Sequence, residues 1–392
     1  MIKIAERLQQ VEEYYFSKKL EEIRLLRAQG KEVLNLGIGS PDLPPEDGVV
    51  DELIESAKNK NNHAYQGYRS SAELREAMSR FYYNTFSVEL DPEEEILPLL
   101  GSKEGVMYIS MAFLNPGDIV LVPNPGYPAY RSIANLLGAE VVAYNLTEEN
   151  NWHPNFAELD QLELSKVKMM WVNYPHMPTG TPASDELFHD LEAFAKKNEI
   201  LLCNDNPYSQ VLNKKPVSIL KFDPDLSHTI ELNSLSKSFN MAGWRVGMVL
   251  GHKNYIDAIL QAKSNVDSGM FLPVQHAAAK ALELTQTWHD ERNEIYEHRR
   301  VKANEILNQI GCSISEHQVG MFVWAKVPAQ IRDTHLLIDD LLYNAHVFIT
   351  PGEVFGTNGK RYIRLSLCSD EKVFEKALKR IKSWQEKKLR LV

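Results

Sequence analysis

The chain has 392 residues, more than one hydrophobic core usually holds, so we expect a large and a small domain. Its formal net charge of -10 at pH 7 argues against a nucleic-acid-binding protein. The three cysteines are widely spaced and form no C-x-x-C pair, so we expect neither a disulfide framework nor a metal site, and we expect a reducing cytoplasm. No signal peptide or membrane-spanning segment is expected.

The predicted elements begin with a helix. Apolar residues at helical spacing predict one amphipathic helix over residues 1–30. A short strand at 33–36 runs into a Gly/Pro turn at 37–42, and a helix follows over about 48–59. From residue 95 strands alternate with helices, one of which begins after Ser184, a favourable N-cap residue. Apolar strands are predicted over 96–100, 119–122, 140–144, 169–172, 200–203, 229–232 and 246–250.

This alternation is typical of an α/β fold with an open, mostly parallel sheet and helices on both faces. The strands are almost continuously apolar, as expected of strands that are buried on both sides. A helix-rich segment at 253–310 is expected to cross between domains, and the strands and helices after it predict a smaller α+β domain. We predict an N-terminal arm with part of the small domain at 1–45, a large ligand-binding domain at 46–285, and the small C-terminal domain at 286–392.

Three of the predicted strands end in polar residues, which are Asn173, Asp205 and Ser234. Ligands of open α/β sheets bind beyond the carboxyl ends of the strands, so these residues predict a site for a small polar ligand. Asp205 could hold a pyridine nitrogen protonated, and Tyr208 could donate to an oxygen on the same ring. The alternative for Asp205 is a simple turn or N-cap aspartate.

The segment at 234–247 holds a single lysine, Lys237, among small hydroxyl residues. Such a lysine can lose its proton and act as an amine nucleophile. Ser234 and Arg245 offer a hydroxyl and a forked cation that suit one phosphate group. The alternative is a surface lysine in a polar loop.

This segment resembles the cofactor-lysine segment of class I/II aminotransferases, with the pattern S-x-S-K-x-x-x-M-x-G-x-R-x-G. The resemblance extends from about residue 34 to residue 367, with the motifs in the family's order. It implies the fold-type I architecture of enzymes that depend on pyridoxal 5'-phosphate (PLP). It also implies an aminotransferase that moves an amino group between an L-amino acid and a 2-oxo acid by a ping-pong mechanism, through a Schiff base on Lys237.

The resemblance assigns further residues to the cofactor. Asp205 and Tyr208 match a D-x-x-Y motif whose members hold the ring nitrogen and the ring oxygen, and they join Lys237 as catalytic residues. Ser102 and Lys103 match a phosphate-binding turn that acts chiefly through its backbone N–H groups. Tyr127 matches the aromatic residue that stacks on the ring. Asn173, Ser234 and Arg245 complete the cofactor set within one chain.

Other matches concern the substrate and a second subunit. Arg364, in the segment Y-I-R-L-S, would bind the substrate carboxylate through a bidentate pair. Gly39 would contact the same carboxylate through its backbone, and Ile38 would border the substrate. Tyr65 matches the tyrosine that reaches the phosphate of the neighbouring subunit, so the resemblance implies a homodimer with shared active sites. Ser70 stands where the family usually has glycine, so the local turn is expected to differ.

One position departs from the family. The segment at 174–180 resembles the P-N-N-P-T-G loop, but its last asparagine is replaced by Met177, and a thioether cannot donate a hydrogen bond. We therefore expect Tyr208 to be the main donor to the ring oxygen, unless Asn173, His176 or water substitutes. The imine that links the cofactor to the lysine is then expected to have a higher pKa than in relatives with asparagine at this position.

Two other activities stay open beside transamination. The motifs barely distinguish it from β-elimination by a C–S lyase of the same fold, whereas a PLP-sensing regulator would need an added DNA-binding domain. Residues 266–271 further resemble the subgroup that contains LL-diaminopimelate aminotransferases, but this does not fix the substrate. Candidates to line the side-chain pocket are Tyr14, Tyr15, Ile38, Lys103, Met270 and Phe271.

Overall fold

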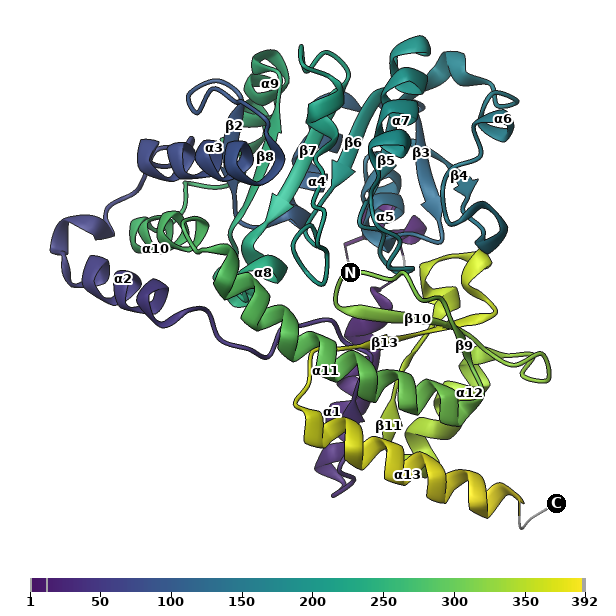
Figure 1. Ribbon diagram of the computed structural model, residues 1–392. Coiled ribbons are helices and arrows are strands. Elements are labelled where there is room, and N and C mark those ends of the chain that lie inside the picture. Colours follow the sequence, from purple (N-terminus) through teal and green to yellow (C-terminus); the bar gives the residue numbers. More distant parts are fainter. Residues whose placement is uncertain (1, 12, 390–392) are drawn as a thin grey trace.

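The computed structural model describes residues 2–11 and 13–389. Its largest sheet has seven strands in the order β2-β8-β7-β6-β5-β3-β4 and lies in the upper half of Figure 1. In that order the strands are Ile96–Leu99, Gly247–Gly251, Thr229–Ser234, Leu201–Asp205, Val167–Val172, Ile119–Asn124 and Glu140–Asn145. Neighbouring strands are parallel except at β8, which runs antiparallel to both β2 and β7. The predicted, mostly parallel sheet is confirmed.

Helices cover both faces of this sheet. Successive residues of a strand point to opposite faces, so Met170 and Trp171 of β5 belong to different cores. The core around Trp171 lies under α4, α5 and α9, which span Ser102–Phe113, Pro128–Leu136 and Lys253–Lys263. The core around Met170 includes α3 and α7, which span Ala72–Phe86 and Asp185–Lys197. Ser184 caps α7 as predicted, because its Oγ accepts a hydrogen bond from Leu187 N at 3.1 Å.

A smaller part of the molecule lies below the large sheet in Figure 1. The long helix α11 (Gln286–Ile310) runs diagonally from the large sheet into it, as predicted. Its antiparallel sheet has the order β12-β13-β10-β9, formed by Thr350–Pro351, Tyr362–Ser366, Phe322–Lys326 and Ser313–Ile314. The smaller α+β part is therefore confirmed, while the domain boundaries at residues 45 and 285 stay a prediction.

The N-terminal segment joins this smaller part. β1 (Leu34–Asn35) pairs in parallel with β11 (Val347–Phe348). The helices around these strands are α1, α12 and α13, which span Tyr15–Ala28, Thr334–Asp340 and Glu371–Leu389. The remaining helices α2, α6, α8 and α10 span Asp47–Lys58, Phe156–Leu159, Leu235–Ser238 and Leu272–Leu282. Across residues 2–11 and 13–389, no helix combines the length and the apolar character needed to cross a membrane.

The single helix predicted over residues 1–30 is wrong. A short 3-10 helix at Glu6–Gln10 is separate from α1, which begins only at Tyr15. Tyr14 precedes α1 with a φ of -54° and a ψ of 122°, outside the helical region. Its ring lines the cavity described below, so a tertiary contact overrides the helical spacing of the sequence.

Candidate active site

A cavity of about 590 Å³ lies at the carboxyl ends of β5, β6 and β7, where it also meets β13 of the smaller sheet. It brings together every predicted site residue except Tyr65. Those residues are Ile38, Gly39, Ser102, Lys103, Tyr127, Asn173, Asp205, Tyr208, Ser234, Lys237, Arg245 and Arg364. Residues nearly 330 positions apart in sequence therefore converge on one space, because the N-terminal segment and the smaller sheet close over the edge of the large one.

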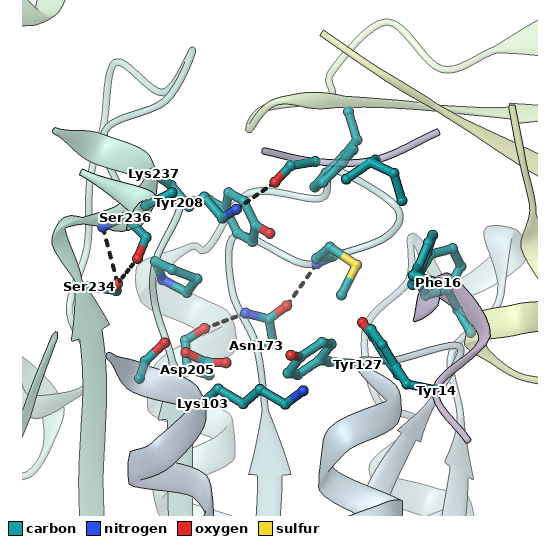
Figure 2. Close-up of a pocket in the computed structure, with 18 of the residues that line it drawn as sticks. Tyr14, Phe16, Lys103, Tyr127, Asn173, Asp205, Tyr208, Ser234, Ser236 and Lys237 are labelled. Atoms are coloured by element: carbon teal, nitrogen blue, oxygen red, sulfur yellow. Dashed lines mark hydrogen bonds between the residues drawn. The ribbon is translucent and has the colours of Figure 1, made fainter. Parts of the chain in front are cut away.

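Lys237 projects into this cavity from α8 (Figure 2). The helix begins directly after β7, and Ser234 caps it by accepting a hydrogen bond from Ser236 N at 3.1 Å. Lys237 Nζ donates to Gly39 O at 2.5 Å. Burial lowers the pKa of the Lys237 amine, and the nearby Arg364 and Arg245 lower it further. The fraction of neutral amine, the form that a nucleophile or base needs, is therefore larger than for a lysine in water.

Asp205 is the last residue of β6 and is 5% exposed. Its Oδ2 accepts a hydrogen bond from Tyr130 OH at 2.9 Å, whereas its buried Oδ1 has no partner among the described residues. Burial raises the pKa of Asp205 to about 7. A buried carboxylate oxygen without a partner is costly, and a positively charged N–H donor would compensate it.

Ser236, Arg245 and the start of α4 form a candidate anion site at the edge of the cavity. Arg245 Nη1 lies 3.5 Å from Ser236 Oγ. The same oxygen accepts a hydrogen bond from the Ser234 hydroxyl at 2.9 Å. Gly101 has a φ of +98°, and a Cβ there would lie 2.1 Å from Arg245 Nη2, so glycine is required for the arginine to reach the turn. Backbone N–H groups at the start of α4, the Ser236 hydroxyl and Arg245 suit a phosphate group.

Arg364 on β13 is 4% exposed and approaches the cavity from the smaller sheet. Its Nη2 donates to Gly37 O at 3.0 Å, and its guanidinium lies 3.8 Å from the ring centre of Phe322 and 4.5 Å from that of Phe355. Burial lowers the pKa of Arg364 to about 10, so the group stays charged at neutral pH. A buried guanidinium held between aromatic rings is suited to a carboxylate ligand.

The family model of aminotransferase class I and II matches residues 31–381. The chain belongs to this family. It is 39% identical over 387 residues to an LL-diaminopimelate aminotransferase of Dehalococcoides mccartyi strain CBDB1, covering 98% of this chain and 100% of that protein. A relative of the same name from Halothermothrix orenii is 35% identical and covers 97% and 98% of the two chains. The substrate-bound structure of BacF from Bacillus subtilis superposes with a TM-score of 0.94 at 34% identity, covering 98% of each chain.

These findings confirm a PLP-dependent aminotransferase of fold type I, close to the LL-diaminopimelate aminotransferases, whose substrates are an amino acid and a 2-oxo acid. The cavity fits PLP. The unpartnered Oδ1 of Asp205 would receive the ring nitrogen, the turn before α4 with Ser236 and Arg245 would hold the phosphate, and Lys237 would hold the cofactor covalently. The β-elimination alternative gains no support from the relatives.

Two residues that matter for this aminotransferase were not predicted. Tyr130 fixes Asp205 through its hydroxyl, and its ring stacks on Trp171 with centroids 4.9 Å apart. Ser236 lines the cavity between Ser234 and Arg245. The sequence signal for Tyr130 was its place three residues after Tyr127, but only the structure shows that its hydroxyl reaches Asp205.

Met177 removes one donor that the family offers to the ring oxygen. Asn173 donates one N–H of its Nδ2 to Asp205 O, and its Oδ1 accepts a hydrogen bond from Met177 N at 2.9 Å, so the second N–H of its amide stays available (Figure 2). His176 is buried, with Nδ1 2.8 Å from Thr179 Oγ1, and does not line the cavity. Met177 Sδ lies 3.2 Å from Arg364 Nη1. Tyr208 and the second N–H of Asn173 are therefore the donors that the loop and its neighbours still offer to the ring oxygen.

Replacing Met177 with asparagine is expected to lower the pKa of the lysine-linked cofactor by about one unit, because a further donor would stabilise the anionic ring oxygen. The pKa would be read from the absorbance of the bound cofactor as a function of pH. Met177→Leu, which has a similar volume and no donor, is the control and should leave the pKa unchanged. A rise in pKa for Met177→Asn, or an equal shift in both variants, would contradict this account.

The wall of the cavity opposite Lys237 is largely apolar. The predicted Tyr14 and Ile38 belong to it, and so do Phe16 and Leu20 of α1, which were not predicted although their four-residue spacing places them on one helix face. Lys103 extends from α4 toward this wall, with its Nζ 4.7 Å from the ring centre of Tyr14 (Figure 2). The other predicted wall residues, Tyr15, Met270 and Phe271, do not line this cavity.

Proposed function

We propose that the reaction takes place in this cavity, with Lys237 as the residue that moves the proton of the substrate Cα. One observation carries the proposal: a lysine with a lowered pKa, an unpartnered buried carboxylate oxygen and a buried arginine border the same cavity in the described part of the chain. Bound PLP would supply an electron sink for the charge left on Cα. Lys237 Nζ would accept the Cα proton and later return it.

The other residues would orient the substrate and hold protons in place. Arg364 would bind the α-carboxylate, and the Gly39 backbone beside Lys237 would border it. Asp205 would keep a proton on the ring nitrogen, while Tyr130 fixes the carboxylate that does so. Tyr208 would donate to the ring oxygen, and Tyr127 would stack on the ring face.

We also propose a homodimer with shared active sites. Tyr65 is 90% exposed and does not line the cavity of its own chain, although its family role is to contact cofactor phosphate. Tyr68 in the same segment and Phe271, whose ring centre lies 5.5 Å from that of His63, are also exposed apolar residues. Exposed apolar side chains that gather on one surface are typical of a protein interface. Tyr65 would therefore complete the site of the second subunit.

The cytoplasmic location also remains a proposal. Cys203, Cys312 and Cys368 are buried and free in the structure. A reducing compartment keeps such thiols unpaired, so these three residues support it.

The donor supported best by the cavity is an L-amino acid with a large apolar or aromatic side chain. Tyr14, Phe16, Leu20 and Ile38 offer apolar surface. Asp205 is the one carboxylate among the described lining residues, and it would face the ring nitrogen of bound PLP, so this wall offers no acidic partner for a distal ammonium group. LL-diaminopimelate, named in the relatives, is the second candidate, because Lys103 could pair with a distal carboxylate.

A panel of donors tests this proposal. The purified holoenzyme would be mixed with phenylalanine, tyrosine, leucine, glutamate or LL-diaminopimelate, and the change in cofactor absorbance would be followed in the half-reaction. We expect kcat/KM for phenylalanine to exceed that for LL-diaminopimelate by about tenfold or more, since a desolvated distal charge lacks a full set of partners. The reverse order would establish the second candidate. Release of pyruvate and ammonia from cysteine conjugates, without an oxo acid, would instead support the β-lyase.

Lys103→Met separates the two donor candidates within the panel. It removes the cation but keeps a flexible apolar side chain of similar length. We expect the rate with LL-diaminopimelate to fall more than the rate with phenylalanine, since only the former carries a distal carboxylate. Equal losses with both donors would assign Lys103 to the cofactor instead of the side-chain wall.

A further inference from the structure

A buried ion pair supports the exposed segment that carries Tyr65. Lys263, near the end of α9, has a side chain that is only 2% exposed, and its Nζ donates to Asp267 Oδ1 at 2.9 Å. The same ammonium donates to the backbone carbonyl of Tyr68 at 3.1 Å. A buried ammonium needs its partners, so this pair ties the end of α9 to residues 65–68.

A second contact holds the same segment. Asp267 Oδ1 also accepts a hydrogen bond from Gly269 N at 2.9 Å, which fixes the turn after α9. Gly269 has a φ of +87°, and a Cβ there would lie 2.8 Å from Gln66 O and 3.2 Å from Gly67 O. The turn therefore packs backbone against backbone on residues 66 and 67, and only glycine permits this approach.

Asp267 thus fixes residues 65–68 both through the Lys263 ammonium and through the Gly269 turn, yet Tyr65 in this segment touches no part of its own cavity. We propose that Asp267 is a positioning residue that acts in trans: it orients the segment 65–68 of one subunit so that Tyr65 serves the cofactor site of the other. This inference rests on the proposed homodimer and names what holds its shared residue in place.

Asp267 also has a link to the cofactor site of its own chain. Its Oδ2 lies 3.2 Å from Tyr108 OH, which lies 2.6 Å from Glu104 Oε1, and Glu104 Oε2 accepts Leu100 N at 2.8 Å just before the phosphate-binding turn. The Tyr108 hydroxyl has one proton, and Glu104 is the nearer acceptor. The connection to its own turn is therefore the weaker of the two, which favours action in trans.

Hybrid dimers distinguish the two routes. Two subunits with different affinity tags would be co-expressed, one carrying Asp267→Asn and the other Lys237→Ala, and the mixed dimer purified. Its one lysine-bearing site receives the segment 65–68 from the subunit with intact Asp267. We expect that site to bind PLP with wild-type affinity, measured by the absorbance of the lysine-linked cofactor.

The reciprocal hybrid carries both substitutions on one subunit and none on the other. Its lysine-bearing site is built on the unchanged chain but receives the segment from the Asp267→Asn subunit. We expect its Kd for PLP to rise about tenfold, as in the Asp267→Asn homodimer. A defect that follows the lysine-bearing subunit, or that is equal in both hybrids, would overturn the inference.

Three further variants complete the test. Tyr108→Phe cuts the link to the chain's own turn and leaves the Lys263–Asp267 pair intact, so its Kd for PLP should stay within about twofold of the wild type. Lys263→Gln, a second variant in case Asp267→Asn does not fold, should reproduce the trans pattern. Tyr65→Phe hybrids test the shared site itself. A monomer in analytical ultracentrifugation would overturn both the homodimer and this inference, whereas a dimer with a trans defect for Tyr65→Phe alone would overturn only the inference.

Discussion

Lys237→Ala is expected to lower the turnover number by at least about 10⁴-fold, because the variant loses both the covalent anchor of the cofactor and the base that moves the Cα proton. The geometry requires a large effect. Lys237 is the cavity lysine whose Nζ lies beside the Gly39 carbonyl and whose pKa is lowered by burial. Arg364 and Arg245 are held by other contacts, and a guanidinium has no lone pair to accept a proton, so neither can replace it as a base.

Single-turnover kinetics with saturating PLP would measure this effect, and dialysis would show separately whether cofactor is still bound. Methylamine added to Lys237→Ala should restore part of the rate, because a small amine can occupy the space of the lost side chain and accept the proton. Lys103→Ala is the matched control, since it removes a lysine from the same cavity and is expected to cost about tenfold at most. If Lys237→Ala kept a tenth of the wild-type turnover, the assignment of the base would be wrong.

The arrangement of strands and helices was largely predictable, because the apolar runs of the large sheet have the length and continuity of strands buried on both faces. The orientation of β8 was not, since an apolar run such as residues 246–250 has no direction of its own. The break before α1 was also missed. Tyr14 follows helical spacing in the sequence, but it gains a place in the cavity by leaving the helix.

Site residues that belong to contiguous motifs, such as Lys237 with Ser234 and Arg364 in its strand, were predicted from the sequence. Residues whose role depends on a distant partner were not. Tyr130 and Asp205 are 75 positions apart, and only the fold brings the hydroxyl of Tyr130 on α5 to the carboxylate at the end of β6. Asn173 was assigned to the cofactor, and it lines the cavity, but its hydrogen bonds to the backbone of Asp205 and Met177 could be seen only in the structure.

Asp205→Asn is expected to reduce kcat by about 10²–10³-fold, because a neutral amide cannot hold a positive charge on the ring nitrogen during the reaction. Asparagine has nearly the same shape and can still accept the Tyr130 hydroxyl at the position of Oδ2, so packing is preserved. The loss should therefore appear in kcat, with the KM for the amino donor changed much less. Tyr130→Phe keeps the charge of Asp205 but removes the hydrogen bond that fixes its carboxylate. Its kcat should lie between that of the wild type and that of Asp205→Asn. Equal kcat values for the wild type and Asp205→Asn would contradict the assignment.

The same substitution makes a prediction for stability. Burial raises the pKa of Asp205 from 3.8 to about 7, so the folded, cofactor-free protein holds this proton more tightly than the unfolded chain. The stabilisation from the protonated form is fully present below pH 4 and is lost as the pH rises through 7. Asparagine does not titrate, so the free energy of unfolding of the wild type, relative to Asp205→Asn, should fall by up to about 4 kcal/mol between pH 4 and pH 8.

Urea denaturation of both cofactor-free proteins at several pH values would measure this difference. Glu231, whose pKa is also raised by burial, is present in both proteins, but its charge also raises the pKa of Asp205, so the difference reports Asp205 together with its coupling to Glu231. Adding PLP should reverse the trend, because a protonated ring nitrogen beside Oδ1 favours the carboxylate and only the wild type has that charge. A difference that does not depend on pH without cofactor would mean that Asp205 ionises freely in the empty site. The residue would then not be poised by burial to receive the ring nitrogen.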